Sequence, residues 1–477
     1  MQEKNTNTLP IRVRFAPSPT GMMHLGNVRA ALMNYLFAQH AQGTFILRIE
    51  DTDQERNFDP GAKQIIADLQ WLGLTYQEGP FFQSDRGALY QEKLTLLQES
   101  QSVYRCFCTL EELEKRRQRQ IALKQPPRYD RTCTRLSTEE IQNKLGAGTP
   151  FIWRMKIDST KQISFHDLAH GTMTFDLKNF SDFPITRQDG TVTFMFANAI
   201  DDIDMSITHV LRGEDHLTNT VGQTALFAAL GAPLPVFWHM PIMCNTEGKK
   251  LSKRDFGFSL NDLRTAGFLP EAINNYLGIL GGSFEQEILS LYELAQQINI
   301  DHIKTTGRIT YDVEKLRWLN HKWITRCSPQ ELLARILPLL STAYPMIHSL
   351  DQDQLLKLIQ LIHNDLVTLT QSVELLKFYF IAPTVTPAEI PDGTPTPLYT
   401  IIQNNLDSLA EPALFLTTVK QACATANIPL KTLFPVLRLA LTGQQHGPAI
   451  QDILTLLGQQ ESLRRLQDCI KRCCPKA

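Results

Sequence analysis

The sequence predicts an α/β protein: a doubly wound parallel sheet, interrupted by an inserted α+β unit and followed by an all-α body. Strand and helix patterns alternate over residues 12–73, and short strand-like runs crowd together between 151 and 177. Beyond Leu260, apolar residues recur three and four positions apart, which is the helical period. With 477 residues, 43% hydrophobic and 20% charged, the chain has the composition of a globular protein with about three domains.

The first strand is predicted at 12–15, where apolar and charged residues alternate, and a second at 44–50. Pro17, Pro19 and Gly21 turn the chain after the first strand, and helix formers follow from Val28. A strand, a tight loop and a helix in this order present backbone N–H groups and the positive end of a helix dipole to a phosphate. An ordinary βα unit has the same layout, so the layout alone leaves both readings open.

The second strand leads into an acidic loop and then into a helix over 62–73 that Gly73 closes. The loops around Ser18 and Glu50 both follow strand ends. In doubly wound sheets ligands bind beyond the carboxyl ends of the strands, so these two loops are the first candidates for a site.

The character of the sequence changes near Leu89. A helix is predicted to Ser100, then a strongly charged helix, and then strand-like runs between 151 and 177. Strand and helix patterning returns over 191–231, and 236–243 reads as a buried strand that ends at a lysine-rich loop. The proline-rich stretch 383–398 is predicted to be a linker or long loop within the helical body.

Charge and cysteine content narrow the class of protein to which the chain can belong. Lys+Arg number 47 and Asp+Glu 49, a formal charge of −2, so global charge gives no sign of nucleic acid, although a local basic stripe would suffice. Nine cysteines without a signal peptide predict a reducing cytoplasm, with free thiols or a metal site rather than disulfides. No stretch has the length and apolarity of a membrane span, so no membrane association is expected.

Two segments have the chemistry of a polyphosphate site. His24 stands where the first loop becomes a helix, and Lys250 and Lys253 flank a serine after the predicted strand end. A histidine at a helix start and two mobile lysines can hold phosphates and stabilise a polyphosphate leaving group. The alternatives are a buried structural histidine and a solvated basic turn.

A second group suits an acidic amino acid. Arg14 and Arg212 can each hold a carboxylate through two hydrogen bonds, and Glu50 can accept hydrogen bonds from an ammonium group. Ser18 lies in the same loop region. Taken singly, each of these residues is also compatible with an ordinary surface ion pair.

Together these features resemble a known family. P-S-P-T-G-x-x-H-L-G-N and K-L-S-K-R are similar to the two signatures of class I aminoacyl-tRNA synthetases, in their glutamyl form. F-I-L-R-I-E-D-T-D, V-L-R-G-E-D-H-L, L-P-E-A-I-N-N-Y-L-G-I-L-G and L-R-W-L-N also resemble bacterial glutamyl-tRNA synthetases of the glutamyl/glutaminyl subgroup. The resemblance covers essentially residues 11–470.

The resemblance implies a glutamate–tRNA ligase that uses ATP with Mg²⁺ and L-glutamate, charges tRNA(Glu) through a glutamyl-adenylate, and is a cytoplasmic monomer. It also implies a Rossmann-like catalytic domain in two halves at 10–88 and 190–247, an inserted acceptor-stem-binding domain at 89–189, a stem-contact domain with the K-L-S-K-R loop at 248–325, and an all-helical anticodon-binding region of two subdomains at 326–477, with the linker near 383–398.

Matching the family's positions implies roles for individual residues. Those for glutamate are Arg14, Ala16, Ser18, Glu50, Phe194, Asn198 and Arg212; those for ATP are His24, Gly26, Asn27, His216, Lys250 and Lys253, of which His24, Lys250 and Lys253 are expected to be catalytic; those for tRNA are Asp53, Arg56, Arg438, Gly447 and Pro448. At 194 the family usually has tyrosine, so a hydroxyl that would contact the substrate is missing, which bears on substrate affinity and not on the reaction.

A possible zinc site is predicted in the insertion. Cys106-x-Cys108 and Tyr129-x-x-x-Cys133 offer three thiolates and a fourth ligand, and zinc prefers tetrahedral sulfur-rich sites. Some relatives carry this pattern and bind structural zinc, whereas in others only reduced cysteines of a relic site remain. Cys469, Cys473 and Cys474 lie near the end of the chain and are interpreted as non-functional.

Alternative functions are less well supported. A truncated paralogue that glutamylates a tRNA base lacks the helical body, and glutaminyl-tRNA synthetases have a β-barrel there. A non-catalytic tRNA-binding paralogue would be expected to lose His24 or the lysines, and both are intact.

The range of tRNA substrates is left open. In discriminating relatives an arginine reads the last anticodon base. The matching stretch 363–365 contains none, which favours an enzyme that also glutamylates tRNA(Gln) for later amidation.

Overall fold

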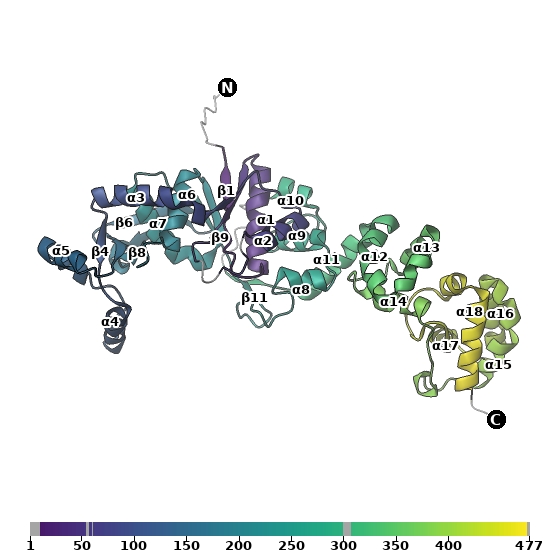
Figure 1. Cartoon of the computed structure of the whole chain (residues 1–477). Coiled ribbons are helices and arrows are strands. Elements are labelled where there is room, and N and C mark those ends of the chain that lie inside the picture. Colours follow the sequence, from purple (N-terminus) through teal and green to yellow (C-terminus); the bar gives the residue numbers. More distant parts are fainter. Residues whose placement is uncertain (1–9, 54–56, 60, 299–306, 475–477) are drawn as a thin grey trace, which may run out of the picture. The chain divides into compact units, whose positions relative to one another are not determined.

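The computed structural model describes residues 10–53, 57–59, 61–298 and 307–474 (Figure 1). The chain divides into two compact units. The first comprises the chain up to Asp262 together with Asn274–Val313, and the second comprises Leu263–Ile273 and Glu314–Ala477. Each unit is described by itself below.

A parallel sheet organises the first unit. β1 (Arg12–Phe15), β2 (Thr44–Ile49) and β3 (Glu78–Phe82) pair in the order β1-β2-β3, and β9 (His209–Gly213) pairs with β10 (Val236–Met240). Backbone hydrogen bonds between Thr208 and Arg12 tie the start of β9 to β1, with N···O 3.0 Å. The spatial order of the parallel strands is therefore β3-β2-β1-β9-β10. The chain adds strands outward in one direction from β1 and in the opposite direction from β9. This confirms the doubly wound sheet and places its switch point beside Arg14 and Arg212.

Helices connect these strands. α1 (Leu25–His40) follows β1, α2 (Lys63–Leu72) follows β2, and α6 (Phe194–Asp204) and α7 (Leu217–Ala229) flank β9. The helix after the first loop begins at Leu25 and is capped by His24, which agrees with the prediction that the loop becomes a helix at His24. α2 ends at Gly73, whose φ of 74° is a left-handed cap, as the sequence predicts. Apolar faces of α6 and α7 pack with β10 in one buried cluster that includes Phe196, Ile200 and Phe237.

The insertion forms a second, small antiparallel sheet of β4 (Val103–Cys106), β5 (Ile152–Met155) and β8 (Phe183–Pro184). Around it lie α3 (Gly87–Glu99), α4 (Leu110–Ala122) and α5 (Thr138–Gly146). The hairpin of β6 (Gln162–Asp167) and β7 (Gly171–Asp176) instead joins the edge of the large sheet, where Asp167 pairs with Phe237 of β10. The hairpin adopts this position because the rings of Phe165 and Phe237 pack at 5.1 Å.

After β10 come short elements: β11 (Met243–Cys244), α8 (Leu260–Thr265), α9 (Pro270–Ile279), α10 (Leu291–Gln297) and β12 (Ile309–Thr310), with β11 and β12 paired. The rest is helical, as predicted: α11 (Val313–Arg326), α12 (Pro329–Ala343), α13 (Gln352–Ile362), α14 (Gln371–Phe380), α15 (Pro397–Asn404), α16 (Pro412–Thr425), α17 (Leu430–Thr442) and α18 (Ile450–Cys473). Two hydrophobic clusters stabilise this body, one around Leu332 and Leu358 and one around Phe415 and Leu437. The proline-rich stretch 383–398 joins α14 to α15. None of the described helices combines the length and apolarity needed to cross a membrane.

Candidate active site

A cavity of about 1160 Å³ opens at the carboxyl ends of β1, β2 and β9 and at the start of α1. Its walls contain every residue singled out for glutamate or ATP, together with Asp53 from the tRNA group. These are Arg14, Ala16, Ser18, His24, Gly26, Asn27, Glu50, Asp53, Phe194, Asn198, Arg212, His216, Lys250 and Lys253. The structure thus brings together groups that are more than two hundred positions apart in the sequence. Arg56 lies outside the described residues.

His24 occupies the N-cap of α1. Its Nδ1 accepts a hydrogen bond from the backbone N–H of Asn27 at 3.3 Å, so the proton of the neutral ring lies on Nε2. Burial, and then the charge of Lys250, lower the pKa of His24, which favours this neutral form. Gly26 leaves the necessary room, because a Cβ there would lie 2.9 Å from the His24 ring. His24 can therefore donate one hydrogen bond to a phosphate oxygen at the positive end of the helix.

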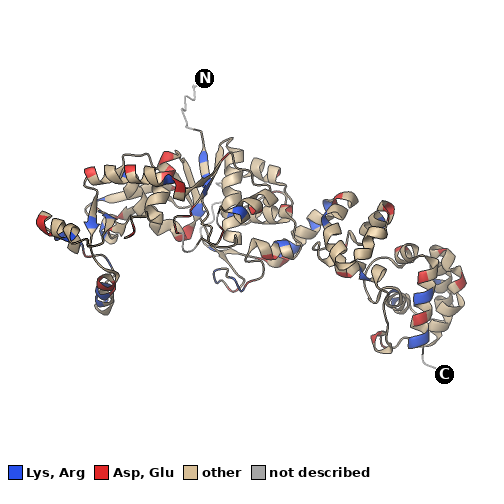
Figure 2. Ribbon diagram, in the orientation of Figure 1, with Lys and Arg blue, Asp and Glu red and all other residues tan. Residues whose placement is uncertain are grey.

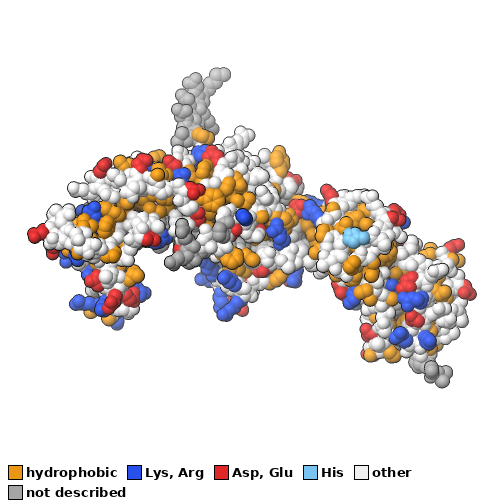
Figure 3. All heavy atoms as spheres, viewed as in Figure 1, with side chains coloured by type: hydrophobic (Ala, Val, Ile, Leu, Met, Phe, Trp, Pro, Cys, Tyr) orange, Lys and Arg blue, Asp and Glu red, His pale blue; other side chains and the backbone are white. Residues whose placement is uncertain are grey.

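The lysine-rich loop is tied to the same helix start. Leu25 N donates to Phe258 O at 2.9 Å, Leu260 N donates to Met23 O at 2.9 Å, and the rings of His24 and Phe258 lie 5.3 Å apart. Figure 2 marks Lys and Arg positions along this loop, which follows β11, and Figure 3 shows their side chains gathered there. These contacts explain why two distant segments line a single cavity.

The two lysines of the loop differ. Lys250 is exposed, and its Nζ lies 3.2 Å from Asp215 Oδ2. Lys253 is also exposed and forms no ion pair with a described residue. Both side chains are therefore accessible to a polyphosphate, which would compete with Asp215 for Lys250.

A buried charge network forms the other end of the cavity. Arg14 Nε donates to Asp202 Oδ1 at 3.0 Å, and the fully buried Arg48 donates to the same oxygen at 2.7 Å. Glu50 accepts a hydrogen bond from Asn198 Nδ2 at 2.5 Å and lies 3.9 Å from Arg48 Nη2. Burial raises the pKa of Glu50 to about 7 despite the opposing charge of Arg48. A cation beside Glu50 would favour its ionised form.

Arg212 is a buried cation with no acidic partner among the described residues. Its Nη2 donates to Thr220 Oγ1 at 2.6 Å and to Gln223 Oε1 at 2.7 Å, while its buried Nε has no hydrogen-bond partner. Burial, and then the nearby Arg14, lower the pKa of Arg212 to about 9. A bound carboxylate would compensate this buried charge and use the free N–H.

Two aromatic rings form another part of the cavity wall. The rings of Phe194 and His216 lie 5.6 Å apart, and burial, followed by the charge of Arg212, lowers the pKa of His216 to about 4. His216 is therefore uncharged at neutral pH, and its surroundings suit an uncharged ring rather than a phosphate.

The sequence reading missed several residues that support this site. Asp202, Thr220 and Gln223 hold the two arginines, and Asp215 and Phe258 contact the phosphate-side residues. The adjacent acidic pair 201–202, within a helix rich in apolar residues, was the available signal for Asp202. No local pattern marked Thr220, since its role depends on pairing between distant strands.

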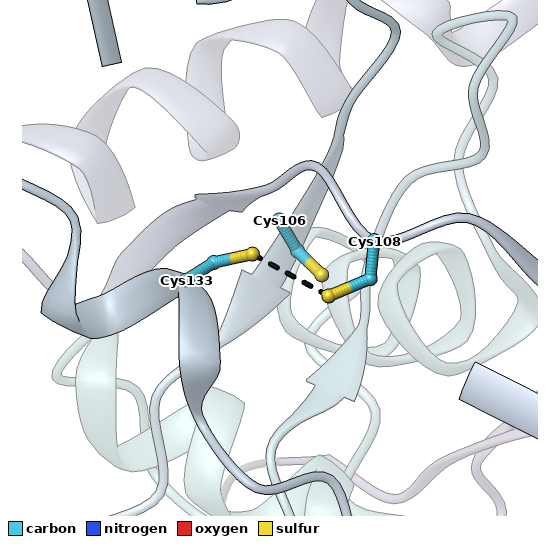
Figure 4. A group of neighbouring side chains, drawn as sticks. All are labelled: Cys106, Cys108 and Cys133. Carbon is cyan, nitrogen blue, oxygen red and sulfur yellow. Dashed lines mark hydrogen bonds between the residues drawn. The ribbon is translucent and has the colours of Figure 1, made fainter. Parts of the chain in front are cut away.

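The cysteines of the insertion form one group (Figure 4). The sulfurs of Cys106, Cys108 and Cys133 lie within 4.8 Å of one another, with Cys108 and Cys133 at 3.5 Å. The Tyr129 hydroxyl is 3.3 Å from Cys106 Sγ and 3.6 Å from Cys108 Sγ. Hydrogen bonding with Cys133, and to a lesser extent with Tyr129, lowers the pKa of Cys106 to about 4. Three sulfurs at this spacing fit the edges of a tetrahedral zinc site with Zn–S bonds of about 2.3 Å.

In the second unit, Arg438 of α17 braces the loop that leads to α18. Its guanidinium donates to Pro448 O at 3.2 Å and to Gln445 O at 3.2 Å, and Gly447 has a φ of 139°. The three residues singled out for the anticodon side thus lie in one loop assembly.

Comparison with known proteins identifies relatives over nearly the whole chain. Residues 10–318 match the catalytic domain of tRNA synthetases class I (E and Q), and residues 331–470 match an anticodon binding domain. The chain is 35% identical to the glutamate–tRNA ligase of Bacillus velezensis over 96% of this chain and 99% of that one. It is 39% identical to that of Thermosynechococcus vestitus over 95% and 96% of the two chains. The solved structure of a glutamate tRNA ligase from Elizabethkingia meningosepticum, in complex with its amino acid, is similar with a TM-score of 0.87 at 28% identity, covering 97% of this chain and 99% of that one. The chain therefore belongs to the class I tRNA synthetases (E and Q) and, within them, to the glutamate–tRNA ligases.

Proposed function

We propose that this chain activates L-glutamate with ATP and transfers it to the 3′-terminal adenosine of tRNA(Glu). The proposal rests on two groups that lie in one cavity. Glu50 offers a carboxyl group for an ammonium, and Arg212, which has no acidic partner among the described residues, offers a guanidinium for a carboxylate. Glu50, held by Asn198, would bind the α-amino group. Arg212 and Arg14 would bind the carboxylates, and Phe194, Ala16 and Ser18 would complete the wall.

In the first step, an oxygen of the α-carboxylate attacks the α-phosphorus of ATP, and the bond to the β-phosphate breaks to release pyrophosphate. The carboxylate is already a nucleophile, so the protein contributes placement and charge stabilisation rather than a general base. His24 would donate from Nε2 to a phosphate oxygen, with Gly26 and Asn27 beside it, and Lys250 and Lys253 would hold the leaving phosphates. Enzymes of this class use ATP with Mg²⁺, which would share the phosphate charge.

In the second step, the 2′-hydroxyl of the terminal adenosine attacks the carbonyl carbon of the adenylate, and AMP and the hydroxyl proton leave. Asp53 lines the cavity and is proposed, with Arg56, to contact the tRNA end. His216 is proposed to lie beside the nucleotide, and Arg438, Gly447 and Pro448 to contact the anticodon.

The direct test measures incorporation of labelled glutamate into purified tRNA(Glu) with ATP and Mg²⁺. Charging with glutamate, and not with glutamine or aspartate, is expected. Absence of charging with a full set of tRNAs would refute the proposal and favour a non-catalytic tRNA-binding protein.

A second test addresses the lysine clamp. Lys253→Ala should lower kcat for pyrophosphate exchange by about a hundredfold and change the KM for glutamate little, because the lost charge stabilises mainly the transition state. Lys249→Ala is the matched control, since Lys249 lies in the same loop and pairs with Glu247 at 2.8 Å. If Lys253→Ala only raised a KM, the clamp role would be wrong.

We also propose that Cys106, Cys108, Cys133 and Tyr129 hold one structural Zn²⁺, supported by the spacing of the sulfurs. The metal would fix β4 against the turn that carries Cys133. We likewise propose the division into the five domains given above, a monomeric state and a cytoplasmic location.

A second candidate function is that of a non-discriminating enzyme that also glutamylates tRNA(Gln). Its support is the stretch 363–365, where His363 Nε2 bonds to Ile324 O at 3.0 Å and no arginine is present to read an anticodon base.

A further inference from the structure

Arg212, the residue proposed to bind the substrate's carboxylate, is held by a chain of buried groups that begins at Asp167. His239 and Arg212 are paired neighbours on the parallel strands β10 and β9, and α7 supplies Thr220 next to both. Asp167, His239 and Thr220 have no exposed surface, and Arg212 is 7% exposed. The proposed reaction uses none of these three residues directly.

Asp167 fixes the proton on His239. Its Oδ1 accepts from the backbone N–H groups of Ala169 and His170 at 2.9 and 3.0 Å. Its Oδ2 accepts from the backbone N of His239 at 3.0 Å and from the ring Nδ1 at 2.7 Å. Although burial opposes ionisation, these bonds hold the pKa of Asp167 below its usual value. A carboxylate that accepts four hydrogen bonds requires the His239 proton to lie on Nδ1.

The ring of His239 then orients Thr220. Burial lowers the pKa of His239, so its Nε2 carries a lone pair and accepts a hydrogen bond. The Thr220 hydroxyl lies 2.8 Å from Nε2 and has one proton, which it donates there in preference to His216 O at 3.2 Å. The oxygen of Thr220 is left as a pure acceptor toward Arg212.

The result is a guanidinium fixed by neutral acceptors. Thr220 Oγ1 and Gln223 Oε1 take both hydrogens of Arg212 Nη2, and Nε stays unpartnered. Asp167 is separated from Arg212 by a ring and a hydroxyl, and Asp202 and Glu50, whose charges also act on Arg212, form no hydrogen bond with it. We propose that Asp167, His239 and Thr220 are positioning residues that hold Arg212 in place without neutralising it, so that the site selects an acidic side chain. The inference rests on the proposed role of Arg212.

The test compares three threonine variants in the full-length enzyme. Thr220→Val removes the hydroxyl at nearly constant volume, Thr220→Ser keeps it, and Thr224→Val is the matched control. Thr224 lies on the same buried face of α7, and among the described residues its hydroxyl bonds only to the Thr220 carbonyl at 2.8 Å. The readouts are KM for glutamate and for ATP, kcat, and the melting temperature.

Thr220→Val should raise the KM for glutamate by about ten- to a hundredfold, because a charge-assisted hydrogen bond is lost, and should leave the KM for ATP unchanged. Thr220→Ser should restore the KM for glutamate. Thr224→Val should lower the melting temperature about as much as Thr220→Val without changing the KM. Equal glutamate KM values for Thr220→Val and Thr224→Val would overturn the inference.

A spectroscopic readout tests the proton directly. ¹⁵N spectra of histidine-labelled enzyme, with His239→Gln to assign the signal, should show the His239 proton on Nδ1. A His239 proton on Nε2 would overturn the inference, because Thr220 could then not donate its proton to the ring. Failure of the proposed function would look different from failure of this inference. If the proposed function were wrong, the unmodified enzyme would not charge glutamate, or Arg212→Lys would also leave the KM for glutamate unchanged.

Discussion

Among single residues, Glu50 has the most unusual setting. It is 8% exposed, it faces an arginine that is completely buried, and among the described residues its one side-chain hydrogen-bond donor is the neutral amide of Asn198. Burial outweighs these contacts and raises its pKa to about 7. The group is therefore poised to gain a full negative charge when a substrate ammonium arrives.

This pKa predicts how glutamate binding depends on pH. Below pH 7 the free enzyme protonates Glu50, and the KM for glutamate should rise about tenfold per pH unit. Steady-state charging between pH 5.5 and 8.5 measures this, and the KM for ATP is the internal control. A KM for glutamate that stays flat from pH 6 to 8 would contradict the assignment.

The same shift has a consequence for stability. The folded state holds the Glu50 proton more tightly than the unfolded chain, so ligand-free protein should lose stability as pH rises from about 5 through 7. Glu50→Gln should remove this slope in melting experiments, because glutamine can still accept from Asn198.

Among the elements, α1 depends on a close approach between Gly26 and the ring that caps the helix. Gly26→Ala would place a Cβ 2.9 Å from His24 Nδ1, so the imidazole must move away from the phosphate position. We expect kcat for pyrophosphate exchange to fall at least tenfold, with little change in the KM for glutamate. Gly87→Ala is the control, since its Cβ would meet nothing within 4 Å at the start of α3. Unchanged kcat for Gly26→Ala would show that the ring position does not matter.

The insertion has an element-level prediction of its own. The turn at Thr132–Arg135 carries Cys133 and is joined to β4 through sulfur contacts rather than a ladder of backbone bonds. If zinc holds it, purified protein should contain about one zinc per chain, and a strong chelator or Cys108→Ser should lower the melting temperature by several degrees.

The control is Cys327→Ser, because the Cys327 thiol follows α11 directly and, among the described residues, bonds only to the Trp323 carbonyl of that helix at 3.5 Å. Tyr129→Phe tests the fourth ligand: retained zinc would mean that water or another group completes the site. Metal-free protein that melts at the same temperature would contradict a structural role.

At the scale of the whole molecule, the residues proposed for glutamate activation and the residues proposed to contact the anticodon belong to different compact units. The cavity residues lie in the first unit, and Arg438 and the stretch 363–365 in the second. Changes in the second unit should therefore alter the choice of tRNA and leave glutamate activation chemistry intact.

The corresponding prediction concerns tRNA scope. The unsubstituted enzyme should charge tRNA(Gln) as well as tRNA(Glu), with kcat/KM values within about a hundredfold of each other, because no arginine stands at 363–365. Charging assays on both purified tRNAs decide this. Charging of tRNA(Glu) alone would reject relaxed specificity, and it would leave the synthetase function untouched.

How far the sequence predicts the structure depends on whether a signal is local. The first strand, the cap at Gly73 and the helical C-terminal half follow from short-range patterns, and all are confirmed. The sequence pattern did not distinguish the strands of the β6–β7 hairpin from the strands of the insertion. Its position depends on one pairing, Asp167 with Phe237, across seventy residues of chain.

The sequence by itself determined the family, the two signature loops and the residue types proposed to bind glutamate and ATP, because proline, glycine and charged residues at fixed spacing constrain the local backbone and chemistry. Only the tertiary structure decided what supports those residues. Asp202 beneath Arg14, and the chain from Asp167 to Arg212, arise where parallel strands and α7 meet. Buried polar groups must find hydrogen-bond partners wherever the fold places them, and those partners lie close in space and not in sequence.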